Sequence, residues 1–247
     1  MTEIGAGISE PPHPAITESI ENDRQRYVDH NIATTVLLSD SPPGSVDAVF
    51  FHGRSFFDAG KRDIFQVAVD YISQGRAQYI LLADSEGERV GETIPQVAYP
   101  GKSLWTDRLV KMGMDRERII YSPHLVPREH GFNTTTEAHA FLNTCIERGF
   151  KTGVVLTQPH QIVRAMLGAV KRIQEQELPV DLWTEAPRSV DWNKKVKGSQ
   201  GMELKPRIYH IQDEIDRVFR YQAKGDIASF DELFDYLATR DNRQNSR

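Results

Sequence analysis

The 247-residue chain contains a single cysteine, Cys145, so it cannot form an intramolecular disulfide bond. This cysteine lies in an apolar stretch with helical spacing, which favours a buried structural thiol over a nucleophile. The chain also lacks an apolar run long enough to cross a bilayer, and its first residues have neither the basic start nor the apolar centre of a signal peptide. We therefore expect a cytoplasmic protein with no membrane partner.

Clusters of basic residues are missing too, and the formal net charge is -5. Because binding to phosphate backbones needs a basic surface, we expect no nucleic-acid partner. The chain contains no G-x-G-x-x-G sequence, no Walker loop and no G-x-S-x-G elbow. These absences argue against standard dinucleotide-binding enzymes, P-loop enzymes and α/β-hydrolases.

Five short apolar runs are typical of strands that are buried on both faces of a parallel sheet. They lie at residues 46–53, 77–84, 118–122, 152–158 and 180–186. Between these runs lie segments whose apolar residues have helical spacing. One of them is residues 63–74, which is followed by Gly75 as a helix stop. This alternation predicts an α/β protein with a Rossmann-like, doubly wound, mostly parallel sheet of about five strands in three layers.

The chain divides into an N-terminal arm and helix at residues 1–45 and a single Rossmann-like domain at residues 46–247. Residues 31–44 are ambiguous, because their pattern fits either an edge strand or the end of a helix. The polar segment at residues 187–206 is predicted to be a flap. Two further helices are expected at residues 209–222 and 230–238.

Polar side chains collect just after the predicted strands, where the carboxyl ends of parallel strands share one edge. We expect these side chains to converge on one crevice, although loops in α/β proteins are polar in any case. The residues concerned are His52, Gly53 and Arg54 after the first strand, Asp84 after the second, Arg128 after the third, and His160 and Arg164 after the fourth.

A helix start at Thr134, Thr135 and Thr136 offers unpaired N–H groups and hydroxyls for an anion, and Arg164 could add a bidentate charge. An ordinary helix cap with Glu137 as its carboxylate explains the same pattern equally well. His160 could transfer a proton or donate a hydrogen bond to a ligand oxygen, or it could simply be satisfied by a backbone carbonyl.

A metal site is a further alternative, less favoured by the sequence. His124 and His130, with Asp84 or Glu86, could hold a divalent cation, but no tight ligand spacing such as H-E-x-x-H is present. A metal-dependent hydrolase therefore stays open as an alternative reading.

The segments VDAVFFHG, AQYILLAD, DRERIIYS, NTTTEA, VVLTQPHQIVRA and EIDRVFRYQAKG occur in an order that resembles the YdcF-like family, which includes SanA-like and ElyC-like proteins. The most specific piece, TQPHQIVRA, is similar to the family pattern Thr-Ser-x-x-His-x-x-Arg-Ala, with three residues between His160 and Arg164 here. The family's Asn-Thr-x-Glu-Asn-Ala motif resembles residues 134–139 if Glu137 is matched, or begins at Asn133 and Thr134 if its start is matched. We prefer Thr135 and Glu137 as the equivalent residues. The family's Gly-Gly pairs after the first two strands are absent here. We therefore expect the pocket that follows the first strand to differ chemically from that of the family.

This resemblance implies a Rossmann-like fold, a charged active site and a reaction that the family does not define, with S-adenosylmethionine binding associated with it. We expect a small-molecule enzyme that binds an anionic ligand: a nucleotide, a phosphorylated metabolite or S-adenosylmethionine. His160, Glu137 and Arg164 would be catalytic, with selectivity from Arg54, Asp84 and Arg128. The alternative to an enzyme is a non-catalytic module that binds a ligand or a partner.

Overall fold

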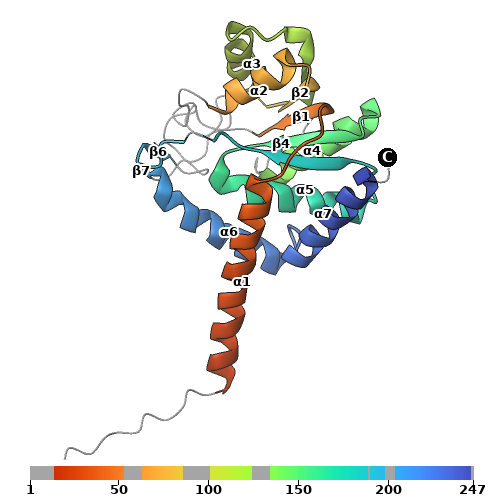
Figure 1. Cartoon of the computed structure of the whole chain (residues 1–247). Coiled ribbons are helices and arrows are strands. Elements are labelled where there is room, and N and C mark those ends of the chain that lie inside the picture. Colours follow the sequence, from red (N-terminus) through yellow and green to blue (C-terminus); the bar gives the residue numbers. More distant parts are fainter. Residues whose placement is uncertain are drawn as a thin grey trace, which may run out of the picture.

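The computed structural model describes residues 14–52, 63–85, 101–123, 134–188, 190–197 and 204–245, with only the backbone described for residues 14–20. Its centre is a sheet of five strands in the order β3-β2-β1-β4-β5, all parallel (Figure 1). The strands are β1 (Val46–Phe51), β2 (Ala77–Ala83), β3 (Ile119–Ser122), β4 (Thr152–Leu156) and β5 (Asp181–Glu185). The predicted fold class, a three-layer Rossmann-like sheet, is confirmed.

Helices cover both faces of this sheet, because alternate strand residues point to opposite sides. The helices α2 (Ile64–Ser73) and α3 (Lys102–Lys111) lie on one face (Figure 1). On this face, Val49 and Phe51 of β1 pack with Trp105 of α3. The opposite face of β1, with Ala48 and Phe50, belongs to a second core. That core also receives the helices α1 (Pro14–Leu38), α4 (Thr134–Arg148), α5 (Ile162–Glu175), α6 (His210–Lys224) and α7 (Phe230–Asn245).

The order of the strands creates a switch point between β1 and β4. From β1 the chain proceeds outward through β2 to β3, and it then returns to the other side of β1 to form β4 and β5. Since crossovers between parallel strands are right-handed, the reversal places α4 and α5 on the face opposite α2 and α3. The connections that leave the carboxyl ends of β1 and β4 run to opposite faces of the sheet, and open α/β sheets bind ligands at such a point.

Two segments differ from the sequence-based prediction, and a third shows which of two predicted conformations residues 31–38 adopt. Residues 31–38 continue α1, and Ala33 and Leu37 of this part are fully buried in the core. The predicted flap contains a small antiparallel pair, β6 (Lys195–Lys197) and β7 (Leu204–Pro206). The final helix extends to Asn245, beyond the predicted end at residue 238. None of the described helices combines the length and apolar character needed to cross a membrane.

The outer edge of β5 is closed by side chains from α7 and the end of α1. The Leu182 N–H donates to the Tyr236 hydroxyl at 2.7 Å, and the Thr184 N–H donates to Asp40 Oδ2 at 3.0 Å. Arg240 donates from Nη1 to the Leu182 carbonyl at 2.6 Å. These outward groups would otherwise be open to pairing with another strand, so side chains complete the edge in place of a sixth strand.

Gly153 allows close packing within the sheet, and its replacement by alanine should lower the free energy of unfolding by about 1–3 kcal/mol. An added Cβ would lie 3.0 Å from both Leu182 Cδ2 and Phe50 Cε1, two side chains that are fully buried. The matched control is Gly44→Ala, because a Cβ at Gly44 meets nothing within 4 Å. Urea denaturation measures both variants, and equal stabilities would contradict the close contact.

Candidate functional site

Charged and polar side chains from four segments meet near the carboxyl ends of β1 and β4. We call this group the carboxyl-edge cluster and define it as His52, Thr134, Glu137, Arg164 and Glu214, each of which is buried. His52 follows β1 directly, and its N–H donates to the Leu156 carbonyl of β4 at 3.2 Å. Thr134 and Glu137 lie in the first turn of α4, Arg164 near the start of α5, and Glu214 in α6.

Arg164 is the centre of the cluster, with only 4% of its surface exposed. Its Nε donates to Glu214 Oε2 at 2.7 Å, and its Nη1 donates to Thr134 Oγ1 at 2.6 Å. Its Nη2 is buried and has no hydrogen-bond acceptor among the described residues. Burial opposes the charge of the guanidinium, but the neighbouring Glu214 carboxylate outweighs it and raises the pKa of Arg164.

Glu214 is the main residue that the sequence analysis missed. Although burial alone would raise its pKa, the charge of Arg164 and its hydrogen bond hold the pKa of Glu214 at about 2. Arg217 Nη1 donates to Oε1 of the same carboxylate at 2.5 Å. The segment EIDRVFRYQAKG, which contributes to the family resemblance, begins at this residue. That segment was the signal from which a role for Glu214 could have been inferred.

His52 and Glu137 form a second buried pair, joined by His52 Nδ1 and Glu137 Oε2 at 3.1 Å. At this distance an ionised carboxylate favours the proton on Nδ1, which leaves the lone pair of the imidazole on Nε2. The His52 ring lies edge-on against Phe141 of α4, with 5.3 Å between ring centroids. Glu137 therefore orients His52.

His160 lies in the short 3-10 turn Pro159–Gln161 that precedes α5, and it is half-buried. Its charge contributes to the low pKa of Glu214, which places it close to the carboxyl-edge cluster. Its ring makes an edge contact with the ring of Trp192, with centroids 6.3 Å apart. The Trp192 carbonyl accepts from the Ile208 N–H at 3.1 Å, which joins the residues just before β6 to those just after β7.

Three further predicted site residues with described positions do not belong to the carboxyl-edge cluster. Asp84 follows β2 and forms an ion pair with Lys102 of α3. Thr135 packs against α5, where a Cβ added at Gly168 would lie 3.3 Å from its hydroxyl. Thr136, also in the first turn of α4, is half-buried. The predicted residues Gly53, Arg54, Glu86, His124, Arg128 and His130 lie outside the described residues.

In the part of the chain that the structure describes, no group of three or more His, Cys, Asp or Glu side chains is placed to hold a metal ion. No family model, curated protein or solved structure matches the chain. The carboxyl-edge cluster contains a buried guanidinium at the start of α5 and an imidazole oriented by a carboxylate. A second imidazole, His160, lies nearby in a half-buried position.

Proposed function

We propose that the protein is a small-molecule enzyme that binds an anionic ligand at the carboxyl edge of its sheet. The ligand class is a nucleotide, a phosphorylated metabolite or S-adenosylmethionine, as expected for a relative of the YdcF-like family. The observation that carries the proposal is the Nη2 group of Arg164, which is buried beside the first turn of α4 and lacks an acceptor among the described residues. A buried donor without an acceptor costs free energy, which a ligand oxygen would recover.

The Nη2 donor of Arg164 and the nearby N-terminus of α4 both favour a ligand oxygen with negative charge. Glu214 and Thr134 accept from two nitrogens of Arg164 and hold the plane of its guanidinium fixed. The N-terminus of α4 carries a partial positive charge from the helix dipole, and Thr134 is the first residue of this helix. A carboxylate or phosphate oxygen would receive a charge-assisted hydrogen bond from Nη2 together with this helix field.

In this proposal the two imidazoles have different roles. His160 is half-buried, so it can reach a ligand and transfer a proton to or from it. His52 is fully buried, and Glu137 fixes the orientation of its ring, so we assign it a positioning role. Trp192 beside His160 contributes an aromatic wall.

The test compares Arg164→Lys with the native chain by titration with inorganic phosphate, nucleotides and S-adenosylmethionine. Lysine keeps the charge that Glu214 needs but loses the planar set of donors, so we expect affinity for the bound probe to fall at least about tenfold. Arg172→Lys is the matched control, because Arg172 lies two turns further along the same helix. Equal affinities of native chain and Arg164→Lys, or no binding of any probe, would contradict the proposal.

The proposed catalytic activity is tested separately, with every probe that binds. Product analysis should detect conversion by the native chain, and His160→Gln should slow it about 10²–10⁴-fold while binding persists. Binding without conversion of any probe would instead support a non-catalytic binding module.

A further inference from the structure

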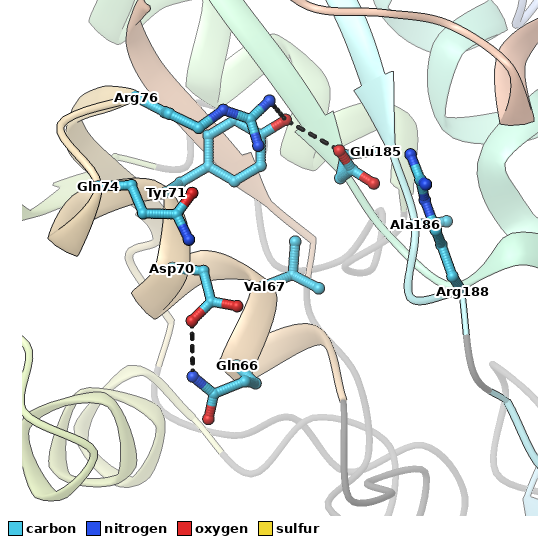
Figure 2. A pocket seen from close by; sticks show the side chains of 9 residues that line it. All are labelled: Gln66, Val67, Asp70, Tyr71, Gln74, Arg76, Glu185, Ala186 and Arg188. Carbon is cyan, nitrogen blue, oxygen red and sulfur yellow. Dashed lines mark hydrogen bonds between the residues drawn. The ribbon is translucent and has the colours of Figure 1, made fainter.

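A concave site lies between the side of α2 and the end of β5. It is a pocket of about 260 Å³ lined by nine residues (Figure 2). None of the nine belongs to the carboxyl-edge cluster. Pockets for drug-sized ligands span about 300–1,000 Å³, so this one suits a smaller molecule.

The topology of the sheet explains why a pocket exists here. The reversal at β1 sends the crossovers to β4 and β5 over the other face, so the face covered by α2 and α3 receives no crossover helix above β4 and β5. One wall is therefore the side of α2, and the opposite wall is the chain that leaves β5 at Glu185 and continues to Arg188.

A chain of hydrogen bonds fixes the shape of one end of the pocket. Arg76 stacks on the ring of Tyr71, 4.2 Å from its centroid, and donates from Nη2 to the Tyr71 hydroxyl at 3.2 Å. The hydroxyl in turn donates to Glu185 Oε2 at 3.0 Å, which joins the two walls. Burial and the Glu185 charge raise the pKa of Tyr71, so it remains a donor to this carboxylate.

The pocket also carries charges of both signs that lack a counter-ion. Asp70 accepts from Gln66 through Oδ1, and no cation contacts it within the described residues. Glu185 uses Oε2 for Tyr71, which leaves Oε1 without a hydrogen bond in the same part of the chain. Across from Asp70, the exposed Arg188 makes no ion pair or hydrogen bond with any described residue. Val67 and Ala186 provide apolar surface between these charges.

We propose that this pocket binds a small zwitterion of the α-amino acid class with an apolar side chain. Asp70 and Oε1 of Glu185 accept from the ammonium group, Arg188 donates to the carboxylate, and the side chain packs on Val67 and Ala186. The lining balances two carboxylates against two guanidinium groups, so a neutral molecule with separated charges matches it better than a simple anion or cation.

The experiment is isothermal titration of the full chain with leucine and with two analogues that each lack one charge. Leucine amide lacks the carboxylate, and 4-methylpentanoate lacks the ammonium group. We expect leucine to bind, and each analogue to bind at least about tenfold more weakly, because each loses one charge-assisted interaction. No binding of leucine, or equal binding of leucine and either analogue, would overturn the proposal.

Two variants locate the site. Asp70→Asn and Arg188→Gln should each weaken leucine binding at least about tenfold. Their matched controls are Asp107→Asn and Arg116→Gln, which change exposed residues outside the pocket and should bind leucine like the native chain. All four variants should unfold at the native temperature, since the changed side chains are exposed or half-buried. Leucine binding that survives both pocket variants would overturn the assignment.

Discussion

Replacing Glu214 with glutamine is expected to lower the free energy of unfolding by about 3–5 kcal/mol at pH 7. The carboxylate neutralises Arg164, which is buried and has no other anion bonded to it among the described residues. Removing one partner of a buried ion pair leaves the other charge uncompensated, and this cost exceeds the loss of the bond itself. Urea denaturation of the variant and the native chain measures the difference.

The effect should also depend on pH in a defined direction. The pKa of Glu214 falls from its ordinary value of 4.5 to about 2 in the folded protein, so the unfolded chain binds the proton more tightly. The carboxylate therefore stabilises the fold above about pH 4.5, and this contribution, on the order of 3 kcal/mol, is lost as the pH falls toward 2. The stability difference between native chain and variant should shrink over the same interval.

Glu147→Gln is the control for this prediction. Glu147 lies in α4 and is exposed, so its replacement should change stability by less than about 0.5 kcal/mol at any pH. A Glu214→Gln variant as stable as this control would mean that Arg164 does not depend on the ion pair.

Replacing Asp40 with alanine should destabilise the fold by a similar amount, about 3–5 kcal/mol. The carboxylate accepts from Nη1 and Nη2 of Arg240, each at 2.9 Å, and also from the Thr184 N–H. Both side chains of the ion pair are at most 8% exposed. Alanine therefore leaves the buried guanidinium with only the exposed Asp241 as a counter-ion, and it leaves the Thr184 N–H without its acceptor. Thermal and urea unfolding followed by circular dichroism test this expectation.

A double-mutant cycle separates the free-energy contribution of the Asp40–Arg240 ion pair from the contribution of the hydrogen bonds to the edge of β5. The variants are Asp40→Ala, Arg240→Ala and their combination, with Asp235→Asn on the exposed side of α7 as the control. Since each single replacement already breaks the bonds between Asp40 and Arg240, the double variant should lose less stability than the sum of the single losses. Additive losses would show that the pair contributes nothing beyond its separate contacts.

The sheet was predictable from the sequence because its strands are buried on both faces and read as short apolar runs. The helical conformation of residues 31–38 could not be predicted with the same certainty. Two threonines and a valine in this segment have low helix propensity, so the pattern also fits a strand. In the structure Thr34 and Thr35 donate to the carbonyls four residues earlier, and the burial of Leu37 stabilises the helix through tertiary packing. Local propensity carries no information about that packing.

The candidate site was predictable in position but not in its pairings. Convergence at the carboxyl edge follows from parallel topology, and Arg164 does contact Thr134 there. The partners of each charge depend on distances between segments far apart in the sequence. Glu137 lies 85 residues from His52, and Glu214 lies 50 residues from Arg164. No periodicity within one helix reveals such partners.

The closed edge of β5 has a consequence for folding during synthesis. In the sequence α1 precedes β5 and α7 follows it. A nascent chain that ends just after β5 therefore still lacks Tyr236 and Arg240, which cover this edge in the folded protein. Over that interval the outward amides of Leu182 and its neighbours can pair with a strand from another nascent molecule. Efficient folding of this protein therefore depends on how quickly α7 docks once it leaves the ribosome.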